Sequence, residues 1–390
     1  MFEGKFVFAQ LMGLVSKYEF KKCVDRYDGN KGVREFSCWS QFLCLCFGQL
    51  THRESLRDIV GCLSADTSKL HHLGIQTDVK RSTFAKANEL RDWRIYGDFA
   101  VVLIAEARAL YIDDEDFSLE LKNTVYALDA TTIDLCLSVF KWAKFRQEKG
   151  AVKLHTLLDL RGSVPTFIWI TDGKVHDVNV LDVMPFEPGA IYVVDRGYVD
   201  FGRLYKIHLA KAFFVTRAKS NFKFRRLYSA AVDKEAGVLC DQTVRPSGKK
   251  AGTDYPEKIR RIKYRDQMTG KTYVFLTNNF ELSAAMIASL YKHRWKVELF
   301  FKWIKQHLKV QVFWGESSNA VKTQVWTAIC TYLLVAILRR RLGITISLNR
   351  ILQILSVYAM DKTPVNELLT KTNYKAEHKQ GSNQLSIFDL

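Results

Sequence analysis

Residues 125–132 read VYALDATT, a short apolar run that ends in an acidic residue. The first four residues are β-prone, so they predict a strand that delivers Asp129 at its tip. Residues 191–198 read IYVVDRGY and repeat the pattern with Asp195, after which Gly197 allows a sharp exit from a sheet. Functional groups collect at such strand ends in α/β sheets, although an aspartate there can also be a helix cap or a turn residue. We expect two strand ends that each carry one aspartate.

The segment between the two aspartates predicts a hairpin. Two β-prone runs, 152–158 and 165–170, flank the sequence DLRGS at 159–163, which has the residues of a tight turn. A short helical stretch from Asp177 to Met184 then precedes the second acidic strand. The order is strand with aspartate, hairpin, helix, strand with aspartate, as in a ribonuclease-H-like sheet. We therefore predict an α/β protein with a ribonuclease-H-like catalytic core.

A third carboxylate lies on a predicted helix further along the chain. The spacing Y-x2-R-x3-E-x6-K is formed by Tyr291, Arg294, Glu298 and Lys305. At ~100° per residue these positions, together with Lys302, fall within one narrow arc of a single helix face. Apolar residues form the adjoining stripe, so one side of the helix packs while cations surround the glutamate. Such a helix can equally be a solvated amphipathic surface, and the two upstream aspartates are what favours a chemical role.

With these motifs the chain resembles DDE transposases of bacterial insertion sequences, in the insertion sequence 4-type group that carries this signature. Every letter and gap of the signature is present, and the resemblance extends over about residues 125–309. It implies that Asp129, Asp195 and Glu298 are a catalytic triad that binds two divalent cations, normally Mg²⁺, which Mn²⁺ can replace. Phosphodiester transfer also requires such a site. Two cations activate the oxygen nucleophile and stabilise the leaving oxygen, and hard cations prefer carboxylate ligands.

The resemblance also implies that the signature cations bind DNA. Arg294 and Lys305, with Lys302 near them, would hold phosphates at the cleaved end, and Tyr291 would contact a phosphate or a displaced nucleotide.

The residue expected to stack on a flipped base departs from the family pattern. Relatives pass through hairpin DNA ends and carry a tryptophan before a Leu-Thr pair, whereas this chain has Tyr273 at that place. Tyrosine can stack on a base, and Trp295 inside the signature can share the role. Tyr273 can also be a strand aromatic in a core, and hairpin chemistry stays an open expectation.

The interval between Asp195 and Glu298 is longer than a compact ribonuclease-H fold needs. Its β-prone segments, 212–216 and 271–277, predict a β-rich insertion at about 203–280. The basic residues expected to face DNA there are Arg217, Lys219, Lys223, Arg225 and Arg226. A charge-rich segment can also be simply solvated. The whole chain has 58 Lys and Arg against 41 Asp and Glu, a formal net charge of +17, which predicts salt-dependent attraction to DNA.

Composition gives further expectations about compartment and membrane. The eight cysteines are scattered without a C-x-x-C pair, which predicts reduced thiols in a cytoplasmic protein and no zinc site. The resemblance further implies a bacterial, nucleoid-associated protein. The longest apolar run, 325–338, is too short to span a bilayer. We expect it to form a buried helix and no membrane contact, with a subunit interface as one place for that helix.

The first ~120 residues have mainly helical periodicity. Segments 39–50 and 55–62 predict helices, and Ser82 is a suitable N-cap for a third helix. A helix-turn-helix reader of the terminal inverted repeats can be built from these segments. The expected recognition residues are Arg81, Thr83, Lys86 and Asn88. A helical scaffold without base contacts explains the pattern nearly as well.

The last residues form a polar stretch, 375–383, followed by QLSIF at 384–388. This peptide resembles the Q-L-[SD]-L-F motif by which bacterial proteins bind the replication sliding clamp. Its Gln384, Leu385, Ile387 and Phe388 would enter an apolar groove of that partner. The alternative is a tail that packs on its own protein.

The predicted organisation has four parts: a helical DNA-binding domain at 1–120, a catalytic domain at 121–310, a helical region with a dimer contact at 311–372, and a tail at 373–390. The predicted function is a DNA transposase that binds terminal inverted repeats, cleaves the element's ends and joins them to target DNA. Because two ends are joined, a homodimer is expected in the DNA complex. The alternatives are a ribonuclease-H-like nuclease or resolvase without strand transfer, and a catalytically idle DNA-binding protein.

Overall fold

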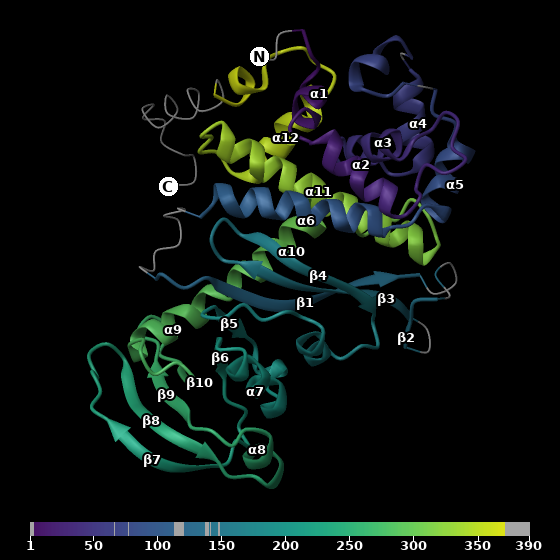
Figure 1. Cartoon of the computed structure of the whole chain (residues 1–390). Coiled ribbons are helices and arrows are strands. Elements are labelled where there is room, and N and C mark those ends of the chain that lie inside the picture. Colours follow the sequence, from purple (N-terminus) through teal and green to yellow (C-terminus); the bar gives the residue numbers. More distant parts are fainter. Residues whose placement is uncertain are drawn as a thin grey trace, which may run out of the picture. The chain divides into compact units, whose positions relative to one another are not determined.

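The computed structural model describes residues 4–65, 67–76, 78–112, 121–136, 140, 142–146 and 149–370 (Figure 1). The chain forms two compact units, one of residues 112–302 and one that combines 1–111 with 303–390. The N-terminal and C-terminal helical regions, expected as separate parts, therefore share one unit. The clamp-like peptide at 384–388 lies outside the described residues.

The unit of residues 112–302 is built on a mixed sheet. Its centre is three parallel strands in the order β1 (Val125–Leu135), β5 (Ile191–Val194) and β6 (Phe213–Arg217). On the other side of β1, β3 (Lys149–Asp159) pairs antiparallel with β1, and β4 (Val164–Asp172) pairs antiparallel with β3. The short β2 (Lys144–Arg146) also pairs with β3. The order β4-β3-β1-β5-β6 confirms the predicted hairpin and the ribonuclease-H-like core.

Local details differ from the prediction. Strand β1 continues past Asp129 to Leu135, because β-branched residues such as Thr131 follow the aspartate and pair with β3. The predicted tip is therefore an interior strand position. The helical stretch after the hairpin is a 3-10 helix, η3 (Asp177–Asp182). Strand β5 ends at Val194 as predicted, and the next residue caps the 3-10 helix η4 (Arg196–Tyr198).

One face of this sheet is held by an apolar core. Leu128, Val194 and Phe214 come from β1, β5 and β6 and are fully buried. Leu204 and Ile207 of α7 (Phe201–Leu209) pack into the same cluster. Because side chains alternate along a strand, the neighbouring residues of β1 and β5 point to the opposite face. The aspartates after Leu128 and Val194 therefore lie on that opposite face.

The β-rich insertion extends the same sheet. It contains β7 (Phe224–Ala230), β8 (Val238–Pro246), α8 (Lys249–Asp254), β9 (Ile259–Arg265) and β10 (Thr272–Thr277). Strand β10 pairs with β6, so the sheet runs from the core into the insertion without a break. Helix α7 packs into the core cluster and β6 pairs with β5, while the expected bounds of the insertion, about 203–280, stay a prediction.

The signature is not one continuous helix. Helix α9 (Ala284–His293) ends before Arg294, and α10 (Trp295–His307) begins after it (Figure 1). The amide of Arg294 bonds to the carbonyl of Tyr291, and the amide of Val297 bonds to the carbonyl of Arg294, so the turn is tightened to three-residue spacing. Arg294 keeps helical dihedral angles, φ −52° and ψ −29°, and the chain continues in nearly the same direction.

The other unit is helical, with α11 (Ser318–Arg341) at its centre. Helix α11 packs against α6 (Arg94–Leu110) and α3 (Cys38–Leu50). Among the described helices it alone is long and apolar enough to cross a membrane, and 94% of its apolar window is buried in the protein. The predicted buried helix is confirmed, and residues of this same chain cover it. The remaining elements are α1 (Val7–Met12), α2 (Lys17–Arg26), α4 (Leu56–Ser64), η1 (Thr67–Lys69), η2 (His71–Leu73), α5 (Arg81–Leu90) and α12 (Leu348–Tyr358).

The helix starts in this unit only partly match the prediction. Ser55 caps α4, because its hydroxyl accepts a hydrogen bond from the amide of Asp58. Helix α5 begins at Arg81 with Lys80 at its N-cap, so Ser82 lies inside the first turn and is not the cap.

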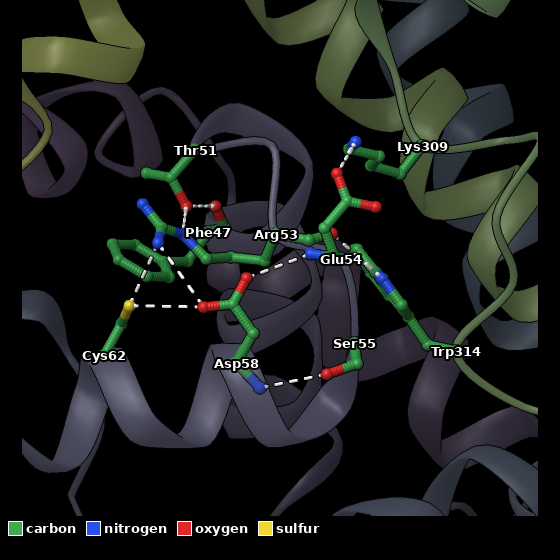
Figure 2. A network of polar contacts seen from close by, with 9 residues as sticks. All are labelled: Phe47, Thr51, Arg53, Glu54, Ser55, Asp58, Cys62, Lys309 and Trp314. Atoms are coloured by element: carbon green, nitrogen blue, oxygen red, sulfur yellow. Dashed lines mark hydrogen bonds and ion pairs between the residues drawn. The ribbon is translucent and has the colours of Figure 1, made fainter.

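Polar side chains hold the segment after α10 against α3 and α4. Figure 2 shows the indole of Trp314 donating to the carbonyl of Arg53, at 3.2 Å, in the turn between these helices. Buried Gln324 donates to the carbonyls of Lys309 and Val312 at 2.6 and 2.9 Å and accepts from the amide of Trp314 at 2.7 Å. Buried Gln49 also bonds to the backbone of Lys309, on both its amide and its carbonyl. These bonds satisfy backbone groups of a loop that has no regular structure of its own.

Candidate active site

Strand register brings the two aspartates together. The last paired residues of β1 and β5 are Leu128 and Val194, and each is followed directly by an aspartate. Asp129 inside β1 and Asp195 directly after the end of β5 therefore lie next to each other, on the same face of the sheet. Two carboxylates from segments 66 residues apart in the chain (195 − 129) meet here.

Asp195 is held as an ion by several donors. Its Oδ1 accepts a hydrogen bond from the hydroxyl of Tyr291 at 3.0 Å, and its Oδ2 accepts one from the amide of Gly197 at 3.3 Å. Burial alone would raise the pKa of Asp195, but the amides of Arg196 and Gly197 and the Tyr291 hydroxyl outweigh burial and lower it. Burial and the charge of Asp195 raise the pKa of Tyr291 to about 12, so its hydroxyl stays a proton donor. Sequence reasoning had assigned Tyr291 to DNA alone and missed this contact.

Arg294 joins the other two carboxylates. Its Nη1 donates to Oδ2 of Asp129 at 2.9 Å, and its Nη2 donates to Oε1 of Glu298 at 2.6 Å. Burial acts to lower the pKa of Arg294, but the negative charge of Asp129, with Tyr291 and Glu298, raises it. Burial raises the pKa of Asp129, and the amide of Ala130 and the Arg294 guanidinium offset only part of that rise. Glu298 is thus linked to Asp129 through a guanidinium.

The donor set fits a hard divalent cation. Asp129, Asp195 and Glu298 supply only carboxylate oxygens, which suit Mg²⁺ and Mn²⁺ rather than thiophilic metals. In the described part of the chain, no three acidic, histidine or cysteine side chains are gathered closely enough to hold a metal ion. The chemistry of the ligands fits the cation, while Arg294 occupies oxygens of two of them.

A cavity of about 520 Å³ opens beside these residues in the same unit. Tyr273, Trp295 and Arg217 line it, together with Tyr291 and Arg294. The Arg217 guanidinium lies over the Tyr273 ring, 5.0 Å from its centre. Trp295 is 58% exposed, which is high for such a large apolar side chain and leaves it accessible to a ligand.

The other predicted DNA-binding residues lie in several places. Lys302 is exposed on α10, and Lys305 follows three residues later in the same helix. Lys219 is exposed and donates to the carbonyl of Val199 at 2.9 Å. The exposed Lys223, Arg225 and Arg226 belong to the loop before β7 and to β7 itself.

The N-terminal recognition residues are only partly exposed. Arg81 and Lys86 project from α5, and Lys86 lines a groove of about 870 Å³ with Lys31, Arg34 and Arg91. Asn88 is 3% exposed and accepts a hydrogen bond from Gln41, so its expected role as a recognition residue was wrong.

Three further residues were not identified from the sequence. Thr156 of β3 is the register partner of Asp129, and its buried hydroxyl has no hydrogen-bond partner among the described residues. Tyr264 and Lys292 line the cavity beside the triad. Strand pairing and helix packing bring them there, and no local motif marks them.

Comparison with known proteins identifies a family. The model of the transposase DDE domain matches residues 120–334, more than half of the 390-residue chain. Residues 3–76 match a second family, described as a domain of unknown function (DUF4372).

Curated relatives share the central region. A Sinorhizobium fredii protein described as a transposase (y4zB) is 37% identical over 57% of this chain and 63% of its own length. A Geobacillus stearothermophilus protein described as a transposase for insertion sequence element IS5377 is 30% identical over 56% of this chain and 57% of its own length. A Synechocystis protein, described as a transposase for insertion sequence element IS4SA, is 26% identical over 66% of this chain and 71% of its own length. The match thus spans less than two thirds of the length of the first two.

Among solved structures, a piggyBac transposase synaptic complex with hairpin DNA aligns with a TM-score of 0.47 and 9% identity, over 98% of this chain and 86% of that chain. The family assignment rests on the domain match and on the curated relatives. The chain belongs to the transposase DDE domain family.

Proposed function

We propose that this protein is the DNA transposase of an insertion sequence, which binds the terminal inverted repeats, cleaves the ends and joins them to target DNA. The family supports the reaction class. The formal net charge of +17 supports a polyanionic partner.

The observation that carries the proposal is the convergence of three carboxylates. Asp129 and Asp195 each follow a residue of the register pair Leu128 and Val194, and Glu298 is linked to Asp129 through Arg294. Surface carboxylates with no shared task do not need this degree of burial and pairing.

The triad would hold two divalent cations, Mg²⁺ or Mn²⁺. When bound, these cations supply activation of the attacking oxygen and stabilisation of the leaving oxygen. Tyr291 keeps Asp195 oriented and ionised, and the amide of Gly197 fixes the second oxygen of the same carboxylate. Arg294, Lys302 and Lys305 bind phosphates of the DNA end, with the arginine able to form two parallel hydrogen bonds.

The aromatic cavity supports a hairpin intermediate in the cut-and-paste reaction. Tyr273 and Trp295 line the cavity next to Tyr291 and Arg294, and Arg217 and Lys292 add positive charge. A base displaced from the DNA end would stack there, since base–aromatic contacts offset about 1–3 kcal/mol of unstacking.

The proposed partners are DNA, a second copy of this chain and the replication sliding clamp. Arg81 and Lys86 contact the terminal repeats, and Arg217 and Lys219 contact DNA near the catalytic core. The protein acts as a homodimer on two DNA ends, in the cytoplasm at the nucleoid. The peptide with Gln384, Leu385, Ile387 and Phe388 binds the replication sliding clamp, and deletion of residues 384–388 would abolish that binding.

Cleavage and strand transfer on the DNA ends that flank this gene test the function. Wild type would cut and join with Mg²⁺, and Glu298→Gln would bind the same DNA but do neither. The exposed Glu257→Gln, in the same unit, is the matched control and keeps both activities.

Other results of this assay would indicate other functions. Cleavage without joining would indicate a ribonuclease-H-like nuclease or resolvase. DNA binding without either activity in wild type would indicate a catalytically idle DNA-binding protein.

A further inference from the structure

One cation pairs with two of the three triad carboxylates. The Arg294 guanidinium contacts Oδ2 of Asp129 at 2.9 Å and Oε1 of Glu298 at 2.6 Å. Its side chain is 15% exposed, so these contacts form largely out of water. Among the described residues, nothing accepts a hydrogen bond from its buried Nε. The ion-pair partners of Arg294 in the described part of the chain are these two carboxylates, and its guanidinium also lies over the Tyr291 ring, 5.9 Å from the ring centre.

A divalent cation would bind the same two carboxylates. Asp129 and Glu298 cannot pair fully with the guanidinium and also bind a dication, because the two cations compete for lone pairs and repel each other. Arg294 would have to give up at least one contact. Leaving a buried guanidinium without an anion is strongly unfavourable, so its release requires a replacement partner.

A DNA phosphate is such a partner. It offers two oxygens that match the guanidinium fork, and Arg294 already lines the 520 Å³ cavity in which Arg217 and Lys292 attract an anion. A phosphate in this cavity would pair with Arg294 in place of Asp129 and Glu298, and the carboxylate oxygens would then be available to a cation.

We propose that Arg294 is an exchangeable counter-ion that occupies the triad until a DNA phosphate replaces the carboxylates, so that DNA and divalent cations bind cooperatively. This inference rests on the proposed transposase function. By linkage, DNA raises the affinity for the cation by the same factor as the cation raises the affinity for DNA. The pairing with Arg294 keeps the affinity of the triad for divalent cations low when no DNA is bound.

The test measures Mn²⁺ affinity of the full chain by electron paramagnetic resonance, with and without a duplex taken from the DNA flanking the gene. Wild type should bind Mn²⁺ at least tenfold more tightly with DNA. Without DNA, Arg294→Gln should bind Mn²⁺ at least tenfold more tightly than wild type, and DNA should change its affinity less than threefold. Lys258→Gln removes the same charge from an exposed residue of the same unit that does not line the cavity, and should retain the wild-type coupling.

Two further measurements distinguish the loss of the counter-ion from misfolding of the Arg294→Gln variant. Arg294→Lys keeps the positive charge but loses the two parallel N–H donors of the guanidinium. Its Mn²⁺ affinity should lie between those of wild type and Arg294→Gln. The melting temperature of Arg294→Gln should rise more on addition of Mn²⁺ than that of wild type, because the ion replaces the missing countercharge.

Different failures have different meanings. If wild type binds DNA but its Mn²⁺ affinity does not change, or if Arg294→Gln binds Mn²⁺ no more tightly than wild type, the counter-ion role is wrong while the transposase function stands. If wild type binds no Mn²⁺ even with DNA, both are wrong.

Discussion

The hydroxyl of Tyr291 donates a hydrogen bond to Oδ1 of Asp195 across 3.0 Å. The donor comes from α9 and the acceptor from the residue after β5, so this bond ties the signature to the strand that carries the aspartate. It is one of the interactions that lower the pKa of Asp195. A tyrosine that the signature spacing predicts to contact DNA thus donates to a carboxylate of the proposed triad.

Tyr291→Phe should slow DNA cleavage about tenfold at neutral pH, because a hydrogen bond to a charged group contributes about 1.5 kcal/mol or more. Without the donor the pKa of Asp195 rises, so the acid limb of the pH–rate profile should move to higher pH. Binding of duplex DNA should change less than twofold. Tyr205→Phe, which removes a hydroxyl from the same unit away from the triad, is the control. An unchanged acid limb would contradict the role of this bond.

The buried His155 makes the free energy of unfolding depend on pH. Burial lowers the pKa of His155 from 6.5 to about 4, and the ring lies 5.2 Å from that of Trp169. The unfolded chain therefore takes up a proton below pH 6.5 that the folded chain refuses until about pH 4. The stability contributed by neutral His155 is complete above pH 6.5 and falls progressively between these two values.

His155→Gln should remove that fall while keeping a donor for Thr171, which lies 3.1 Å from Nε2 of the histidine. Between pH 6.5 and 4.5, wild type should lose about 2–3 kcal/mol more than the variant in urea unfolding. If the free energy of unfolding falls equally with pH in the two proteins, His155 does not titrate in this range.

Much of the catalytic core was predictable because its signals are local. The apolar run before Asp195 and the turn at 159–163 specify a strand and a hairpin whatever surrounds them. The extension of β1 beyond Asp129 depends on pairing with β3, which no short window contains. The break at Arg294 depends on a tightened turn inside an uninterrupted helical pattern.

The contacts inside the site were less predictable than its members. Spacing identified Arg294 and Glu298 as neighbours on a helix face, and the structure links them at 2.6 Å. The second partner of Arg294, Asp129, lies 165 residues away in the chain and comes from another element. The merger of the N-terminal and C-terminal helices into one unit was missed for the same reason, since α11 packs on α3 and α6 through long-range contacts.

Gln324 should be important for the stability of the helical unit. It is 2% exposed, and its side chain satisfies two carbonyls and one amide of the segment from Lys309 to Trp314. Gln324→Leu removes the bonds to the carbonyl of Val312 and the amide of Trp314 and leaves the carbonyl of Lys309 with Gln49. It should lower the free energy of unfolding by about 2–4 kcal/mol. The exposed Gln353→Leu on α12 should change it by less than about 0.5 kcal/mol. Equal unfolding midpoints for the two variants would mean that water replaces the glutamine.

Trp295 should matter for a step after the first cut. Its ring is 58% exposed and lines the cavity next to the triad, where a displaced base could stack. Loss of one stacking contact is worth about 1–3 kcal/mol, which corresponds to roughly 5–150-fold in hairpin formation. We expect Trp295→Ala to nick the DNA end at the wild-type rate but to form hairpins at least fivefold more slowly, with Trp295→Phe in between. Tyr273→Ala should show the same selective defect if both rings hold the base.

Fluorescence of 2-aminopurine placed at the DNA end gives a direct measure of the stacking that the two rings would provide. A base that leaves the duplex but finds no ring stays bright, whereas stacking on an aromatic side chain quenches it. Wild type should therefore quench the emission that base displacement creates, and Trp295→Ala should leave it bright. Phe280→Ala is the matched control, because Phe280 is 48% exposed in the same unit but does not line the cavity. Bright emission with wild type, or equal hairpin yields from all variants, would exclude Trp295 as the stacking surface and leave it as a simple duplex contact.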